Sequence, residues 1–163
     1  MGGETVADIV DIDWYWGFNN DEETTCWVAL SSANKESGCM KFIPGSHKEQ
    51  IVPHFDTFDD NNLLSRGQEI SVKVNEKEAK YIELKPGEAS MHHGHLFHAS
   101  GPNKTSDRRI GCAIRYIKPS MKQLSGDLSL VTLVSGVDDY GHFTKSEKPN
   151  GRLNEVDFNR CYL

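Results

Sequence analysis

Short apolar runs separated by turn signals recur along the chain. Pairs of Pro and Gly such as Pro44-Gly45, Pro86-Gly87 and Gly101-Pro102 supply the backbone angles that tight turns require. Runs rich in β-branched and aromatic residues that have the length of a strand lie between the turns. The pattern predicts strands at Thr24–Leu30, Met40–Ile43, Glu69–Val74, Lys80–Leu84, Glu88–Met91 and Ile110–Ile117.

The spacing of these runs predicts an all-β fold. An antiparallel protein must protect its sheet edges, and a double-sheet jelly roll of about eight strands does so with a ligand-sized mouth at one end. The run Ile110–Ile117 is apolar on both faces, so we expect an internal strand there. Asp56–Arg66 is predicted to be a loop or a weak helix, and Tyr140–Asn150 a covering loop.

The size and charge of the chain restrict its class. A chain of 163 residues with 37% hydrophobic content fits one domain, residues 1–163. The net charge of -6 and the pI near 5.6 argue against nucleic acid or a membrane surface as partner, since both attract clusters of Lys and Arg. A small molecule is the expected partner.

The cysteines and the N-terminus indicate the compartment. Cys26, Cys39, Cys112 and Cys161 lie far apart and are predicted to be reduced thiols. The start of the sequence lacks the basic and apolar regions of a signal peptide, and no run of about 18 apolar residues is present. We therefore expect a cytoplasmic protein.

Two acidic residues precede the first aromatic cluster. Asp11 and Asp13 are two positions apart, so on a strand both side chains would point to one face. From spacing alone, an acidic strand end at the surface and a pair of carboxylates facing a cavity both remain open.

Four of the seven histidines of the chain lie between positions 92 and 98. Neutral imidazole is the commonest ligand of first-row divalent metals, so the cluster suggests a metal site. His98 is the expected ligand, because it ends a strand directly before the Ser-Gly-Pro-Asn turn, whereas His92, His93 and His95 are expected to be surface or hydrogen-bonded core residues. Arg109 opens the next apolar strand and presents a planar fork suited to a carboxylate.

Two segments resemble the signatures of the phytanoyl-CoA dioxygenase family. The stretch from Cys26 to Lys48, with its Ser37-Gly38 and Ile43-Pro-Gly-Ser-His47 motifs, is similar to the central signature, and His98-Ala-Ser-Gly-Pro-Asn103 followed by Arg109 is similar to the second. The later Leu133–Phe143 also resembles the family. The resemblance implies a double-stranded β-helix with its core at residues 8–120 and a C-terminal covering segment at residues 121–163.

The resemblance also implies cofactors and site residues. Working members use Fe(II), 2-oxoglutarate and O2 to hydroxylate a small molecule that the sequence does not identify. The motifs place Asp13 and His98 at metal positions and Asp11, tentatively, where the family has its first His. Arg109 would clamp the far carboxylate of 2-oxoglutarate, with Ser100 and Trp27 at further cosubstrate positions.

Two departures from the family pattern leave alternatives open. A carboxylate at Asp11 in place of imidazole shifts preference from Fe(II) toward harder metals. Only ten residues precede Asp11, fewer than in family members, which suggests missing bracing elements and a homodimer through exposed sheet surface. The chain is therefore predicted to be a 2-oxoglutarate-dependent oxygenase or, alternatively, a non-catalytic jelly roll that keeps an anion pocket. A cupin-like isomerase or storage barrel is less favoured, since it would not need Arg109.

Overall fold

The computed structural model describes residues 17–49, 52–56, 58, 68–124, 130–152 and 154–160. Nearly all regular structure in this part of the chain is β. The elements are β1 (Glu23–Ala29), β2 (Met40–Phe42), the 3-10 helix η2 (Ser46–Lys48), β3 (His54–Asp56), β4 (Gln68–Ile70), the 3-10 helix η3 (Glu76–Glu78), β5 (Lys80–Tyr81), β6 (Ala89–His93), β7 (His98–Ser100), β8 (Gly111–Ile117), β9 (Leu130–Val131), β10 (Thr144–Lys145) and α1 (Glu155–Arg160).

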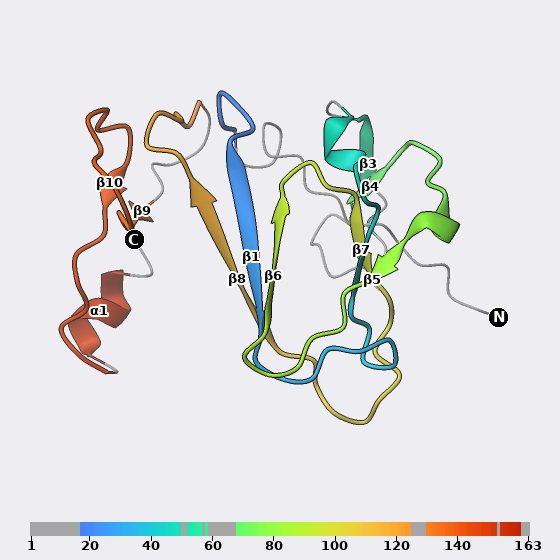
Figure 1. The fold of residues 1–163 in the computed structure, drawn as a ribbon. Helices are drawn as coiled ribbons and strands as arrows, with labels where there is room; N and C mark the ends of the chain where they lie inside the picture. The colour runs from blue at the N-terminus through green and yellow to red at the C-terminus, as the bar shows by residue number, and fades with distance from the viewer. Residues whose placement is uncertain are drawn as a thin grey trace.

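Two three-stranded antiparallel sheets form the centre of the molecule (Figure 1). One sheet has the order β6-β1-β8 and the other the order β5-β2-β7. The ring of Phe42 on β2 lies 4.8 Å from the ring of His92 on β6, so the sheets pack face to face. Two packed antiparallel sheets agree with the predicted jelly roll.

Among the described strands, β8 does not occupy the internal position that the sequence predicted. Instead of lying inside a sheet, β8 is an outer strand of the described sheet, and β1 is the central one. The seven residues of β1 pair along their whole length with β8, and five of them pair with β6. The apolar residues of β8 are largely exposed, which explains why the strand reads as apolar on both faces without being internal.

Strand β1 shows the alternation of a sheet with one buried face. Glu23, Thr25 and Ala29 are buried, and the residues between them are more exposed. The inward row of β1 faces the second sheet, where Met40 and Phe42 are buried. The site residues therefore lie between the two sheets.

The remaining segments lie around these two sheets. β3 pairs with β4, and β9 pairs with β10 in parallel. In Figure 1, β9, β10 and α1 lie beyond β8, on the side away from the second sheet. A ring nitrogen of His142 lies 2.8 Å from the carbonyl oxygen of Met121 and ties this segment to the end of the core. The covering role of residues 121–163 stays a prediction.

Three of the four cysteines lie within the described residues, and Cys161 lies outside them. Cys26, Cys39 and Cys112 are free thiols. Among the described residues, none of the helices has the length and apolar character to cross a bilayer.

Glu23 provides a test of the buried face of β1. Burial raises the pKa of its carboxyl, while a hydrogen bond of 2.7 Å from the Thr25 hydroxyl works in the opposite direction. A raised pKa in the folded state means that stability is lost as the pH rises through that pKa. We expect Glu23→Gln to become progressively more stable than the parent between pH 4 and pH 7 in urea unfolding. Exposed Glu36→Gln is the control. A stability difference between Glu23→Gln and the parent that does not change with pH would contradict the raised pKa of Glu23.

Candidate active site

The two sequence signatures meet in space through the pairing of β2 with β7. His98 lies opposite Phe42 and Ser100 opposite Met40 in the antiparallel register. The buried Ser46 hydroxyl accepts a hydrogen bond of 2.8 Å from the backbone N–H of Phe97 and donates one of 2.8 Å to the carbonyl of Ile43. The Pro-Gly-Ser turn of the central signature thereby holds the backbone of Phe97, the residue directly before His98.

A second contact joins the signatures at the other end of the same strands. Gly38 has a φ of +72°, and a Cβ there would lie 2.2 Å from the carbonyl oxygen of Gly101. Only glycine permits both the positive φ and this close approach. The Ser37-Gly38 turn therefore packs directly against the Gly101-Pro102 turn that follows Ser100.

His98 lies between the sheets with one ring nitrogen already engaged. Its Nδ1 is 2.7 Å from the carbonyl oxygen of Leu96. A carbonyl can only accept, so Nδ1 carries the proton and Nε2 of the neutral ring keeps its lone pair. Burial lowers the pKa of His98, which favours this neutral form. A metal-ligating histidine needs this arrangement, and the prediction for His98 agrees with it.

The sequence predicted a surface or hydrogen-bonded core residue at His92, and the structure shows a buried residue with one unpartnered ring nitrogen. Its side chain is buried, at 7% exposure, and its ring lies 4.8 Å from that of Phe42 and 5.1 Å from that of His98. Its Nδ1 is buried and has no hydrogen-bond partner among the described residues. Burial is the largest cause that lowers the pKa of His92 to about 4. Strand alternation separates His92 from His93, but only the tertiary fold shows which of the two faces inward.

His93 and His95 belong to a different cluster. The His93 ring lies 5.2 Å from the ring of His95 and 6.0 Å from that of His47, and Nδ1 of His95 lies 3.5 Å from a carboxylate oxygen of Asp21. Nε2 of His95 is buried and unpartnered in the part of the chain that the structure describes, so this residue also departs from the expectation. No three His, Cys, Asp or Glu residues within the described ranges are arranged to hold a metal ion.

Arg109 is held in the interior by an aromatic ring instead of an acid. Its guanidinium carbon lies 5.5 Å from the ring centroid of Trp27, a cation–π distance. Gly111 makes room for the indole, since a Cβ there would be 2.0 Å from Cζ2 of Trp27. Burial lowers the pKa of Arg109, and no carboxylate of the described residues forms an ion pair with it. A half-buried guanidinium without an acid partner is an anion site.

The imidazoles and the guanidinium share one inner surface. Thr25 pairs with His92 and Trp27 pairs with Ser90 on the inward row of β1. Two residues along a strand span roughly 7 Å, so the indole beside Arg109 lies one inward position from the histidine pair. Ser100 lies two positions after His98 on β7 and faces the same side.

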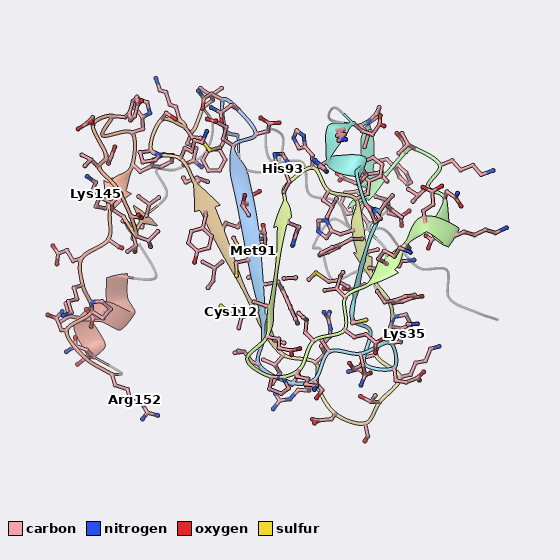
Figure 2. All side chains as sticks on the ribbon, in the orientation of Figure 1. Lys35, Met91, His93, Cys112, Lys145 and Arg152 are labelled. Atoms are coloured by element: carbon pink, nitrogen blue, oxygen red, sulfur yellow. The ribbon has the colours of Figure 1, made fainter. Side chains whose placement is uncertain are left out.

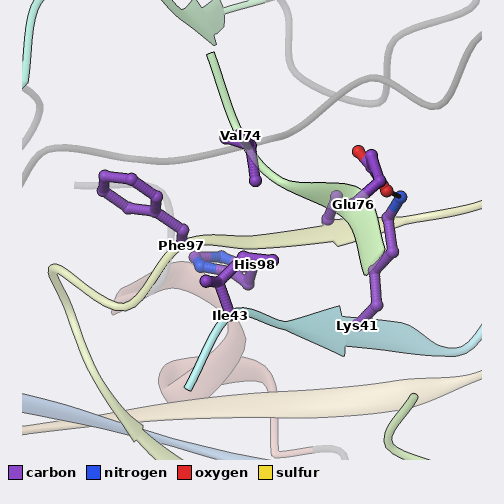
Figure 3. Close-up of a pocket in the computed structure, with 7 residues that line it drawn as sticks. Lys41, Ile43, Val74, Glu76, Phe97 and His98 are labelled. Atoms are coloured by element: carbon purple, nitrogen blue, oxygen red, sulfur yellow. Dashed lines mark hydrogen bonds and ion pairs between the residues drawn. The ribbon is translucent and has the colours of Figure 1, made fainter. Parts of the chain in front are cut away.

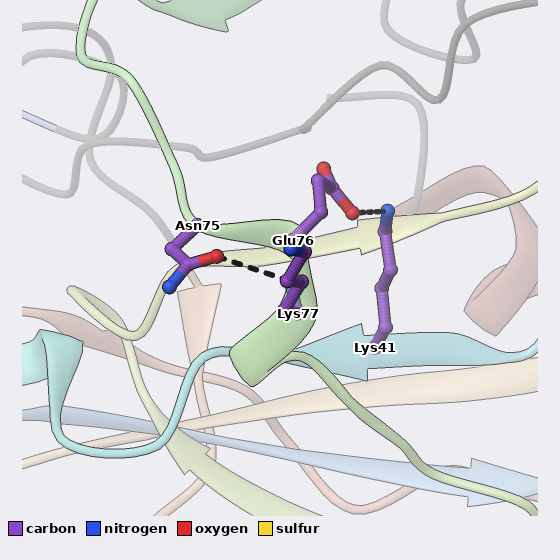
Figure 4. A network of polar contacts seen from close by, with 4 residues as sticks. All are labelled: Lys41, Asn75, Glu76 and Lys77. Carbon is purple, nitrogen blue, oxygen red and sulfur yellow. Dashed lines mark hydrogen bonds and ion pairs between the residues drawn. The ribbon is translucent and has the colours of Figure 1, made fainter.

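A small pocket lies on β2 and β7, next to His98. Its lining is Lys41, Ile43, Val74, Glu76, Phe97, His98 and Ala99 (Figure 3). The ammonium of Lys41 forms an ion pair with Glu76, and the side chain of Asn75 accepts the N–H of Lys77 at the start of η3 (Figure 4). Lys41 is therefore paired, whereas Arg109 forms no ion pair with a described residue. A further cation, Arg115 on β8, lies close enough to His92 and His98 that its charge helps to lower the pKa of both.

Asp11 and Asp13 lie outside the described residues, so the structure does not test either assignment. The described site provides one imidazole with a free Nε2, a second imidazole beside it and an unpaired guanidinium. These residues fit a divalent metal and a dicarboxylate, since imidazole ligates the first and a guanidinium fork binds the second.

The family model of phytanoyl-CoA dioxygenase (PhyH) matches residues 11–111, which include both signatures and Arg109. The chain belongs to the phytanoyl-CoA dioxygenase family. This membership confirms the family resemblance, and the two-sheet structure agrees with the fold that it implied.

Three similar proteins support the relationship. The apo structure of the non-heme monooxygenase ThoJ is 33% identical at a TM-score of 0.76, over 91% of this chain and 53% of that one. CytC3 with Fe(II) and alpha-ketoglutarate is 26% identical at a TM-score of 0.51, over 76% and 44%. A probable alpha-ketoglutarate-dependent hypophosphite dioxygenase of Stutzerimonas stutzeri is 28% identical over 107 residues, 64% of this chain and 37% of that protein.

The expected cofactors, Fe(II) and 2-oxoglutarate, agree with these family relationships. The chain spans about half or less of the length of these relatives.

The contact between Trp27 and Gly111 can be tested directly. In Gly111→Ala the new methyl group would overlap the indole, so Trp27 must leave its place beside Arg109. We expect a shifted tryptophan emission spectrum and at least a tenfold weaker affinity for 2-oxoglutarate, measured by calorimetry in the presence of a divalent metal. Gly151→Ala, with open space at its Cβ, is the control. Unchanged affinity in Gly111→Ala would show that the indole does not position the guanidinium.

Proposed function

We propose that this protein is an Fe(II)- and 2-oxoglutarate-dependent dioxygenase that hydroxylates a small molecule. The observation that carries the proposal is Arg109. Its guanidinium is half-buried, stacked on Trp27 and free of any described acid partner, beside a pair of buried imidazoles. A dicarboxylate that reaches from the metal to Arg109 satisfies both groups.

The proposal assigns a role to each site residue. His98 and Asp13 bind the metal, and Asp11 is a tentative further ligand at the place of the family's first His. Arg109 binds the far carboxylate of 2-oxoglutarate. In keeping with the resemblance, Ser100 and Trp27 complete the cosubstrate site, as a hydroxyl on the inward side of β7 and an aromatic wall on β1.

The chain's own residues bind and orient the reactants. Nδ1–H of His98 donates a hydrogen bond to the Leu96 carbonyl, so Nε2 would be the atom that binds the metal. The rings of Phe42 and Trp27 would keep water from the space between the sheets. Bound Fe(II) supplies the redox chemistry that couples O2 and 2-oxoglutarate decarboxylation to C–H hydroxylation. The substrate class stays open.

A second candidate is a non-catalytic jelly roll that retains the anion pocket. The carboxylate of Asp11 at the position of an imidazole favours it, because an added anionic oxygen ligand makes a site harder and less suited to Fe(II). Such a protein would bind dicarboxylates at Arg109 without binding iron.

Anaerobic titration with Fe(II) and 2-oxoglutarate distinguishes the two functions. The oxygenase is expected to develop the weak visible charge-transfer band of the chelated pair. Absence of the band in a folded sample, shown by circular dichroism, would contradict the oxygenase and favour the binding protein.

Replacement of the guanidinium separates cosubstrate binding from metal binding. We expect Arg109→Ala to abolish 2-oxoglutarate binding, a loss of a hundredfold or more, and to leave metal affinity unchanged. The neighbouring exposed Arg108→Ala provides the control for lost charge. Retained 2-oxoglutarate binding in Arg109→Ala would show that another group holds the carboxylate.

We further propose that two copies associate through β8. Met91, Cys26 and Ile114 form a row across the outer face of the β6-β1-β8 sheet, and Met91 and Ile114 are 66% and 40% exposed. Figure 2 shows Met91 and Cys112 on this sheet. A two-fold axis perpendicular to this outer face would lay the apolar rows of two copies against each other.

Charge on the outer face tests this association. We expect Ile114→Lys to convert a dimer to a monomer in light scattering, because the ammonium would be buried between two copies. Val137→Lys, at a site that is 73% exposed, is the control. A parent protein that is monomeric at all concentrations would exclude the dimer.

A further inference from the structure

His92 combines two properties that a core histidine seldom has together. More than nine-tenths of its side chain is buried, and its Nδ1 has no partner among the described residues. A buried polar atom without a hydrogen bond is destabilising, so such an atom can mark a place where a ligand, ion or water binds.

The position of the ring relative to His98 restricts what that ligand can be. The two ring centroids are 5.1 Å apart, with an interplanar angle of 52°. With metal–nitrogen bonds of about 2.1 Å, two imidazoles on neighbouring positions of one ion place their centroids roughly 4.5–5.2 Å apart. The observed separation falls within that range.

The surrounding residues hold both rings in this arrangement. Phe42 contacts His92 at 4.8 Å and meets His98 edge-on at 6.3 Å. Strand pairing fixes the backbones, since His92 lies opposite Thr25 on β1 and His98 opposite Phe42 on β2. The two imidazoles therefore come from different sheets and lie beside each other between the layers, at a separation that suits two ligands of one metal ion.

We propose that His92 is a ligand of the same metal ion as His98, and that it supplies the second imidazole that the family obtains from the position of Asp11. This inference rests on the proposed metal site at His98 and Asp13. If Asp13 supplies the carboxylate, as the family resemblance implies, the donor set would be the two-histidine, one-carboxylate set typical of non-heme Fe(II) sites. The number of nitrogen ligands is then the same as in the family, although Asp11 stands in the place of the family's first histidine.

Zn(II) titration of histidine-labelled protein tests the proposal without requiring activity. Long-range 1H–15N spectra report each imidazole nitrogen, and a metal-bound nitrogen shifts away from its free position. We expect saturation with Zn(II) to shift nitrogens of both His92 and His98, and His93 to remain unchanged.

Variants then measure the contribution of each ring. His92→Phe keeps an aromatic ring against Phe42 and is expected to weaken Zn(II) and anaerobic Fe(II) binding at least tenfold. His93→Phe, one position away on the opposite face, should bind both metals as the parent does. His92→Asn provides a second variant in case the phenyl ring prevents folding, and circular dichroism checks each protein.

The possible failures are distinguishable. If His98 shifts with Zn(II) while His92 does not, and His92→Phe keeps full metal affinity, the role of His92 is excluded and the proposed metal site survives. If neither imidazole shifts and Fe(II) does not bind, the proposed function fails together with this inference.

Discussion

The antiparallel pairing of β2 with β7 is the contact on which the rest of the site depends. Neither strand is longer than three residues, so backbone hydrogen bonds alone hold them weakly. The Ser46 hydroxyl and the close approach of Gly38 to Gly101 reinforce the two ends. These contacts place the start of β7, and with it the ring of His98, against the inner face of the other sheet.

The space between the sheets contains more polar groups than its hydrogen bonds satisfy. His92 Nδ1 and Ser90 Oγ are buried without described partners, and Arg109 has an indole beside it where a structural arginine would have a carboxylate. A core selected only for stability would avoid these costs. Buried polar groups without partners are common at functional sites. Here these groups lie around the residues that the two signatures position.

The histidine cluster shows how strand geometry divides one sequence motif between two environments. His92 and His93 are adjacent, yet alternation on β6 points the first ring between the sheets and the second toward His47. The turn after β6 then returns the chain so that His98 lies near His92 again. The imidazole that the family has at the position of Asp11 therefore need not come from a neighbouring residue in the sequence. In the proposed site, sheet packing brings the ring of His92 to His98 from another strand.

The sequence by itself determined the all-β class and the family, and it predicted His98, Arg109, Ser100 and Trp27 as site residues, because turn residues, alternation and spaced motifs are local and survive in linear order. It could not give the order of the described strands, in which β1 is central and β8 lies at the edge, since apolar residues on both faces of a strand also occur on an exposed sheet. Nor could it select His92 from its neighbours. Those outcomes were decided by strand order and by the packing of one sheet on the other, which depend on contacts between residues far apart in the chain.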